Sequence, residues 1–426
     1  MVPYFFPPLG MGGVQRPLKF ARYLPEFGWD VTVLTPAAVL YHATDASLLA
    51  ELPDSVRVER VRTFDPTRWI GRMRSSVHSP STPSTLSTKS YSPLESLREW
   101  LRWPDNKRAF IGPATRRAAR LAATRPFDIV WTTSPPPSTH LVGLRLQRRL
   151  FIPWVADFRD PWFACFDYWG PTRWHALYAQ RLQSQIASTA DRVVAASEAI
   201  KASICRGDAS AAVIYNGFDE SDFAGIDPVR GQDEAFSALL YGTFGDNPDP
   251  EPIFTLFGEW QRTHPSAPFR IRHVGLSVGI NEPALAARCG LGNRFESLGY
   301  LPHGQSIQAL VSADLVVLSV GSHPGYQNIV PGRIFEMLRS LRPILLFTPG
   351  DCEASRLLQD IDGCWIVPKD NIRAGMAALD EIVALPRNTP VRAVSSIRQY
   401  ERREQTRHLA TLLDSLKSAV PRVGAP

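Results

Sequence analysis

Apolar runs of strand length recur along the chain, and each ends in Gly, Pro or Asp before a segment whose apolar residues have helical spacing. The first series consists of WDVTVLTP, FDIVWTTSPPP, IPWVADFRDPW, DRVVAASE and AAVIYNGFD. A second series begins after Asp222 with FSALLYGTFG, FRIRHVG, RFESLGYLP, ADLVVLSVG, RPILLFTPG and GCWIVPKD. Buried strands that alternate with helices are typical of parallel sheets. The pattern therefore predicts an α/β protein with two consecutive parallel-sheet domains.

The length of the chain agrees with this division, because 426 residues exceed what one ordinary hydrophobic core of about 100–200 residues accommodates. We expect an N-terminal domain over residues 1–210, a C-terminal domain over residues 211–394, and a helix within residues 395–426 that packs back on the first domain. A Ser/Thr/Pro-rich segment at about residues 74–93 is nearly free of aliphatic side chains. Such a segment cannot offset its ordering entropy by burial, so it predicts a mobile insertion.

The start of the chain and its cysteines exclude several classes of protein. No run approaches the ~18 uninterrupted apolar residues of a membrane span, and MVPYFFPPLG lacks the parts of a signal peptide, so we expect a cytosolic protein. MVPYFF is short for a first buried strand, so that strand is brief or the sequence begins late. The five cysteines show no C-x-x-C spacing, which argues against a zinc site, a disulfide framework or a redox pair.

Basic residues give the chain a net charge of +6 and a pI near 9.1. They gather with two tryptophans, Trp100 and Trp103, in one part of the first domain: Arg98, Arg102, Lys107, Arg108, Arg116, Arg117, Arg120, Arg145, Arg148 and Arg149. An aromatic and cationic set suits an anionic membrane surface. A solvated helix face explains it equally well. Nucleic acid is not favoured, because no recognition module accompanies the charge.

The pair Gly12-Gly13 precedes a helix whose apolar positions Val14, Leu18 and Ala21 recur at helical spacing. Glycines at such a junction permit close approach of the backbone to a ligand, and the N–H groups at a helix start favour an anion. The segment lacks both the full G-x-G-x-x-G fingerprint and the Lys of a P-loop. It therefore predicts either a phosphate-binding loop or a plain turn.

The stretch NIVPGRIFEML places Arg333 and Glu336 on one face of a helix that Pro331 and Gly332 open. A guanidinium at this place can bind a diphosphate, and a carboxylate one turn further can accept hydrogen bonds from a vicinal diol such as ribose. The alternative is an ion pair between the two side chains, worth at most about 0.5 kcal/mol. The local sequence does not separate the two interpretations.

Seven motifs in order resemble the family 4 glycosyltransferases, which have the GT-B fold: YFFPPLGMGGVQR, VADFRDPW, VIYNGFD, YGTFG, HVG, LGYLPHGQSIQALVSADLVVLS and VPGRIFEMLRSLRPIL. They cover nearly the whole chain. Within the family, the most similar branch is that of bacterial cell-surface polysaccharide and O-antigen assembly. The resemblance implies two Rossmann-like parallel-sheet domains that face a cleft, the first binding the acceptor and the second a nucleotide-sugar.

By this resemblance, Glu336 binds the ribose hydroxyls, and Arg333 neutralises the diphosphate together with the Gly12-Gly13 loop. The remaining residues that the resemblance places at the donor are Asn216, Gly242, Asn328 and Gly332. Asn328 stands eight residues before Glu336, where the wider family has an acid. The basic pair that many members carry after the first strand of the second domain is absent from YGTFGDNPDPE.

The implied reaction is transfer of a sugar from a nucleoside diphosphate with retention of configuration. No cofactor or metal is implied, since there is no convincing D-x-D motif. VADFRDPW places Asp157, Arg159 and Asp160 at a strand end, where a carboxylate could accept the acceptor's proton; a structural network of these residues is the alternative. His140, which follows SPPPST, is a further candidate, with a packing or capping role as its alternative.

The expected acceptor is a glycan or a polyprenyl-diphosphate-linked lipid, and the expected location is the cytoplasm, with contact to the inner face of the plasma membrane. Two other functions stay open. One is a GT-B sugar-nucleotide epimerase. The other is a non-catalytic scaffold of a polysaccharide assembly complex, which Asn328 and the missing basic pair suggest. Neither the donor sugar nor its base follows from the sequence.

Overall fold

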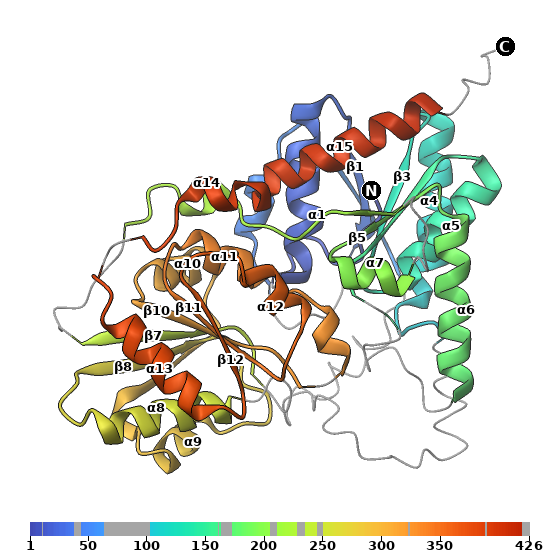
Figure 1. Ribbon diagram of the computed structural model, residues 1–426. Helices are drawn as coiled ribbons and strands as arrows, with labels where there is room; N and C mark the ends of the chain where they lie inside the picture. The colour runs from blue at the N-terminus through green and yellow to red at the C-terminus, as the bar shows by residue number, and fades with distance from the viewer. Residues whose placement is uncertain are drawn as a thin grey trace, which may run out of the picture. The chain divides into compact units, whose positions relative to one another are not determined.

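The structure is a computed structural model, and it divides into two compact units (Figure 1). It describes residues 1–10, 12–37, 44–63, 103–160, 162, 173–204, 211–227, 235–244, 250–322, 324–387 and 390–419. The first unit holds the described residues up to Asn216 and those from Arg402 onward, and the second holds those from Gly217 to Glu401. The predicted insertion at about residues 74–93, together with Arg98, Trp100 and Arg102, lies outside the described residues.

Parallel strands form the centre of the first unit. They are β1 (Thr32–Pro36), β2 (Arg57–Val61), β3 (Val130–Ser134), β4 (Trp154–Phe158), β5 (Arg192–Ala195) and β6 (Ala211–Val213). β3 to β6 pair in chain order, and β1 pairs with β2. Met1 and Val2 connect these two groups, because the N-terminal ammonium donates to the Thr32 carbonyl at 2.8 Å and the Val2 N–H donates to the Trp131 carbonyl at 2.8 Å. The strand order is thus β2, β1, the first two residues, β3, β4, β5 and β6.

Helices cover this layer: α1 (Gly12–Tyr23), α4 (Ile111–Thr124), α5 (Ser138–Leu150), α6 (Arg173–Thr189), α7 (Glu198–Ile204) and α15 (Arg402–Ala419), with the short 3-10 helices Leu24–Phe27, Ser47–Glu51 and Arg108–Phe110. α15 lies along α1 (Figure 1), and Leu409 and Leu413 of α15 share one apolar cluster with Val14 and Leu18 of α1. β6 pairs with β5. The first unit therefore runs to Asn216, past the boundary at residue 210 that the sequence predicts.

The second unit has one six-stranded parallel sheet in the order β12-β11-β10-β7-β8-β9. Its strands are β7 (Phe236–Tyr241), β8 (Phe269–Val274), β9 (Phe295–Gly299), β10 (Leu315–Ser319), β11 (Ile344–Thr348) and β12 (Cys364–Pro368). Its helices are α8 (Glu251–Thr263), α9 (Glu282–Arg288), α10 (His303–Val311), α11 (Arg333–Arg339), α12 (Glu353–Leu358), α13 (Ile372–Val383) and α14 (Val394–Ile397), with 3-10 helices at Glu220–Phe223, Gly292–Arg294, Pro324–Asn328 and Arg398–Tyr400.

The order of the strands locates a binding edge in each unit. In the second unit the order reverses between β7 and β10, and in the first it reverses between the first two residues and β3. Open parallel sheets bind ligands at the carboxyl ends of the strands beside such a reversal. Gly242 directly follows β7, and Ser134 is the last residue of β3. The α/β class with parallel sheets in both units, predicted from the apolar runs, is confirmed.

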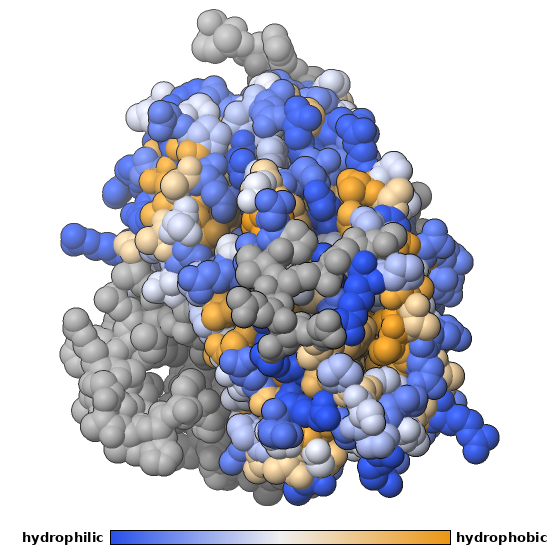
Figure 2. Space-filling view, turned by 90° about the vertical axis from the view of Figure 1, so that its left-hand side faces the viewer, coloured by the Kyte–Doolittle hydropathy of each residue, from blue (hydrophilic) through white to orange (hydrophobic). Residues whose placement is uncertain are grey.

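The described helices include none with the length and apolarity that a bilayer crossing demands. Figure 2 shows one face of the molecule on which hydrophilic residues predominate and apolar residues lie in separate small patches.

Candidate active site

Arg333 lies against Gly242 at the strand-order reversal of the second unit. A Cβ added to Gly242 would be 2.0 Å from Nη1 and 2.3 Å from Cζ of Arg333, and Gly242 has φ +125°. Both the space and the backbone angle therefore require glycine. The Nε atom of Arg333 is buried and has no hydrogen-bond partner in the described part of the chain.

The surroundings of Arg333 leave its charge only partly compensated. Burial lowers the pKa of Arg333, while the nearby Tyr241, Glu336 and Tyr326 raise it. A guanidinium remains protonated in proteins, so the site holds a desolvated positive charge with an unused donor. An anion that accepts from Nε would offset the cost of leaving this group unpaired.

Glu336 is held beside this charge by a tyrosine. The Tyr241 hydroxyl donates to Oε2 of Glu336 at 2.8 Å and lies 3.4 Å from Oγ of Ser306. Burial, and then the charge of Glu336, raise the pKa of Tyr241 well above its ordinary value, so the phenol keeps its proton. Oε1 of Glu336 accepts no hydrogen bond from the described residues, which leaves it available to a hydroxyl ligand.

Arg333 and Glu336 are both described by the structure and do not form the ion pair that their helical spacing allows. Arg333 instead contacts Gly242, and Glu336 instead accepts from Tyr241. Gly332 precedes α11 with right-handed backbone angles, φ −56° and ψ −32°. Asn328, the last residue of the 3-10 helix before this segment, is half-buried.

In the first unit, Asp157 on β4 is fully buried and its oxygens are occupied. Arg16 of α1 donates to Oδ1 at 2.7 Å and to Oδ2 at 3.1 Å, and the Thr133 hydroxyl donates to Oδ2 at 2.7 Å. Arg16 also donates to the Tyr215 carbonyl at 2.9 Å. A carboxylate with these partners and 0% exposure is out of reach of a substrate. The geometry favours the structural interpretation of Asp157, with Arg16 as its partner.

Arg159 connects the start of α1 to the end of β3. It donates to the carbonyls of Gly13 at 2.5 Å, Ser134 at 2.9 Å and Pro135 at 3.1 Å. The predicted glycine loop and the predicted arginine thus meet at the strand-order reversal of the first unit. Asp160 follows Arg159 and is half-buried.

His140 is fully buried beneath these strand ends. Its Nδ1 lies 2.7 Å from the Thr132 hydroxyl, and its ring centroid lies 4.6 Å from that of Phe158 and 5.7 Å from that of Trp162. Burial, together with the charge of Arg159, lowers the pKa of His140 to about 3, so the ring is neutral at pH 7. These contacts favour packing over contact with a substrate.

The structure brings Gly242, Arg333 and Glu336 together in the second unit, and Gly13 and Arg159 together in the first. Asn216 is the last residue of the first unit and is half-buried. Sequence reasoning missed three residues that shape these groups: Arg16, Thr133 and Tyr241. One feature of the sequence could have identified Arg16 as a buried charge: it lies among the apolar positions of α1 that face the core.

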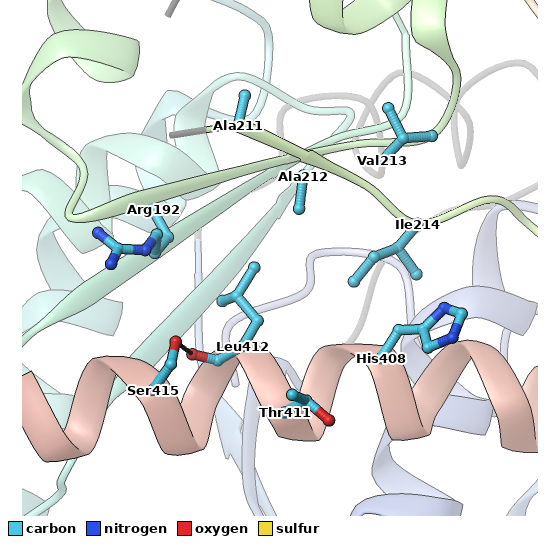
Figure 3. A pocket seen from close by; sticks show the side chains of 9 residues that line it. All are labelled: Arg192, Ala211, Ala212, Val213, Ile214, His408, Thr411, Leu412 and Ser415. Atoms are coloured by element: carbon cyan, nitrogen blue, oxygen red, sulfur yellow. Dashed lines mark hydrogen bonds between the residues drawn. The ribbon is translucent and has the colours of Figure 1, made fainter. Parts of the chain in front are cut away.

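A shallow hollow of about 520 Å³ lies on the first unit between β6 and α15 (Figure 3). Arg192, Val213, His408 and Leu412 line it, and Ser415 donates to the Leu412 carbonyl at 2.7 Å. It contains none of the residues predicted to bind donor or acceptor.

Comparison with known proteins identifies the family. Residues 11–222 match the family model described as Glycosyltransferase Family 4. No curated protein sequence matches the chain.

Solved structures agree with the chain over nearly its full length. Sucrose-phosphate synthase from Thermosynechococcus elongatus is 14% identical, with a TM-score of 0.64 over 99% of this chain and 100% of that one. Trehalose 6-phosphate synthase from Burkholderia multivorans is 13% identical, with a TM-score of 0.64 over 100% and 98%. The lipopolysaccharide outer core galactosyltransferase WaaB is 12% identical, with a TM-score of 0.58 over 97% and 99%. At these identities the likeness shows the fold alone. The chain is a glycosyltransferase with the GT-B fold, and residues 11–222 form its Glycosyltransferase Family 4 domain.

Proposed function

We propose that this glycosyltransferase retains the configuration of the sugar it moves from a nucleoside diphosphate to a glycan or a polyprenyl-diphosphate-linked acceptor in cell-surface polysaccharide synthesis. The observation that carries the donor part is the buried, unpartnered Nε of Arg333 beside Gly242. It is a cation prepared for an anionic ligand at a strand-order reversal.

A diphosphate fits this cation better than a neutral ligand does. Oxygens of a diphosphate accept strong, charge-assisted hydrogen bonds from a guanidinium. The glycine at position 242 removes the side chain that would otherwise stand between the ligand and the backbone. Arg333 would therefore hold the diphosphate of the donor and stabilise the charge that develops on it as the sugar leaves.

A ribose fits the carboxylate of Glu336. Tyr241 fixes one carboxylate oxygen, and Oε1 is left to accept from a hydroxyl. Because the carboxylate of Glu336 is fixed before the ligand arrives, the entropy cost of binding the ribose is lower. We place the ribose hydroxyls at Glu336 and the transferred sugar nearer Asn328, Gly332 and Gly242.

The rest of the mechanism follows from the family resemblance and from the chemistry of the residues. Retention is carried over from the resemblance. In this proposal the positive charge of Arg333 stabilises the departing diphosphate, and no metal ion or other cofactor takes part. On the first unit, Arg159 with the Gly12-Gly13 loop would bind the phosphate-bearing part of the substrates, and Asp160 is the remaining carboxylate for the acceptor's proton.

A thermal-shift screen with UDP-, GDP- and dTDP-sugars tests the donor site. We expect one nucleotide class to raise the midpoint of unfolding of the wild type, because a ligand that binds only the folded state stabilises it. Glu336→Ala should lose most of that shift, whereas Glu296→Ala, on the exposed side of β9, should keep it. Equal shifts in all three proteins would contradict the proposed site.

Product analysis with a labelled donor separates the reactions. Transfer to an acceptor gives a labelled glycoside. Release of an epimerised sugar without a glycoside would instead support the epimerase. Donor binding without turnover on a broad acceptor panel would point to the scaffold.

The membrane part of the proposal rests on the outer faces of α4 and α5, two neighbouring helices (Figure 1) without an acidic residue. Their exposed arginines without an ion pair among the described residues are Arg116, Arg120, Arg145, Arg148 and Arg149. At the end of α5, Phe151 is 86% exposed. Basic side chains with an exposed aromatic suit an anionic lipid surface. We therefore place the enzyme in the cytoplasm, at the inner face of the plasma membrane.

Liposome co-sedimentation tests this surface. We expect the wild type to sediment with anionic vesicles and not with neutral ones, because each basic residue near an anionic surface contributes about 1 kcal/mol. The triple substitution Arg145→Gln, Arg148→Gln and Arg149→Gln should abolish sedimentation. Its control carries the same charge change on α8, α9 and α12 of the second unit, as Arg262→Gln, Arg288→Gln and Arg356→Gln. Equal loss in both proteins would mean a response to net charge alone.

A further inference from the structure

A buried histidine contacts the backbone of Gly242, and a buried glutamate contacts that histidine. Neither side chain takes part in the proposed contacts with the donor. His273 on β8 is 0% exposed, and Glu282 at the start of α9 is 2% exposed. Nε2 of His273 lies 2.6 Å from the Gly242 carbonyl oxygen, and Nδ1 lies 2.8 Å from Oε1 of Glu282. The imidazole therefore stands between the backbone of the donor loop and a carboxylate.

The partners determine where the hydrogens of His273 are. A carbonyl oxygen only accepts, so Nε2 carries a hydrogen. Burial alone raises the pKa of Glu282, but His273 and the hydroxyls of Ser277 and Ser297 bring it below its usual range, so Glu282 is ionised. Nδ1 faces Oε1 of Glu282 at an ion-pair distance of 2.8 Å, but neither atom has a hydrogen bond among the described residues.

The same short segment fixes Gly242 from two further directions. The Gly242 N–H donates to the Val274 carbonyl at 2.9 Å. A Cβ on Gly275 would be 1.9 Å from the Gly242 carbonyl oxygen, and Gly275 has φ +153°. His273, Val274 and Gly275 therefore determine the position of the Gly242 peptide, and Gly242 in turn supports the guanidinium of Arg333.

We propose that His273 is a positioning residue for the donor site: it holds the Gly242 carbonyl, Glu282 packs against the other side of the imidazole, and together they fix the place of Arg333. The proposal rests on the proposed donor site for its effect on catalysis, but the placement of Arg333 is testable without any ligand. A ring that only filled space could be replaced by phenylalanine without effect on Arg333. The ring of His273 is tilted against that of Phe244, with ring centroids 4.7 Å apart, and His273→Phe keeps an aromatic ring at that place.

The first arm of the test uses ligand-free protein labelled with ¹⁵N in the histidine and arginine side chains. We expect Nε2 of His273 to give the signal of a nitrogen that carries a hydrogen, and His273→Phe to move the Arg333 Nε–Hε signal. The control is His264→Phe, since His264 is 41% exposed beside Asp380 in the same unit. An Arg333 signal that stays in place in folded His273→Phe protein would overturn the proposal.

A second pair of variants covers the case in which His273→Phe does not fold. Glu282→Leu removes the partner of Nδ1 and should move the Arg333 signal. Glu282→Gln keeps an amide that can pair with Nδ1 in either orientation, and its Arg333 signal should stay near that of the wild type. Identical Arg333 signals in the two variants would also overturn the proposal.

The second arm measures steady-state kinetics with the donor that the thermal-shift screen identifies. The loss of one buried hydrogen bond corresponds to a change of about tenfold, and we expect it in kcat/KM for the donor of His273→Phe, with the acceptor KM unchanged. A wild-type kcat/KM for the donor would contradict a positioning role. If the wild type binds no nucleotide-sugar and the first arm succeeds, the proposed function fails and the positioning of Arg333 stands.

Discussion

Replacing Arg333 with glutamine should lower kcat/KM for the donor by about 10²–10³-fold, the size of effect seen when one preorganised donor to a developing negative charge is removed. The reason is that Nε has no hydrogen-bond partner among the described residues and that the nearby Glu336 compensates the charge of the guanidinium only in part. Arg333→Lys should recover only part of the loss, because an ammonium keeps the charge but cannot reproduce the planar fork. Steady-state kinetics with varied donor measures both.

The matched control for this prediction is Arg294→Gln. Arg294 is also a half-buried arginine of the second unit, but it donates to the carbonyls of Ala267 and Phe269 at 3.2 and 3.3 Å, at the opposite end of β8 from Gly242. It should keep wild-type kinetics. A loss for Arg333→Gln no larger than for Arg294→Gln would mean that the diphosphate does not bind at Gly242.

Replacing Asp157 with leucine should destabilise the first unit by about 3–5 kcal/mol, because it leaves the buried charge of Arg16 unpaired. Arg16 is 2% exposed and donates two of its three hydrogen bonds to this carboxylate. The double substitution Arg16→Met with Asp157→Leu should restore most of the stability, since apolar residues of similar volume often replace a buried pair without loss. Urea unfolding of the wild type and the two variants measures these changes.

The control for Asp157 is the surface pair of Arg117 and Glu59, whose side chains are 44% and 28% exposed. Glu59→Leu should cost at most about 1 kcal/mol. If Asp157→Leu cost no more than this, the structural role would be wrong, and the alternative role of Asp157 as a proton acceptor would regain support.

The architecture followed from the sequence because parallel strands are buried on both faces. β10 and β11 are apolar at nearly every position and are fully buried. Their continuous apolar runs therefore identify them as strands from the sequence alone. β2 was missed for the opposite reason. Its sequence RVERV has three charged residues among five, and only its last residue is buried, so it resembles a surface segment.

The candidate site was only partly predictable, because helical spacing reports which residues share a face and nothing about partners from other strands. Arg333 and Glu336 were found from their spacing and from the family resemblance. Tyr241 and His273 lie on different strands from α11, and their contacts with Glu336 and Gly242 depend on the order of β7, β8 and β10 in the sheet. The partner of Asp157 was not predictable from its motif, because Arg16 lies 141 positions from Asp157 in the chain.

The family and the fold predicted from seven motifs are confirmed by the family model over residues 11–222 and by the solved GT-B structures. The polysaccharide branch, the retaining mechanism and the individual binding roles stay predictions. They depend on the chemistry of the ligand, which neither spacing nor fold specifies.

The path of the chain also sets an order for its synthesis. α15 belongs to the first unit, but it follows every residue of the second. On the ribosome, the second unit can complete its core before the first, although the first begins to emerge earlier. Until α15 arrives, the apolar side of α1 that carries Val14 and Leu18 has no cover from Leu409 and Leu413. The nascent first unit thus exposes apolar surface until the last helix of the chain has been synthesised.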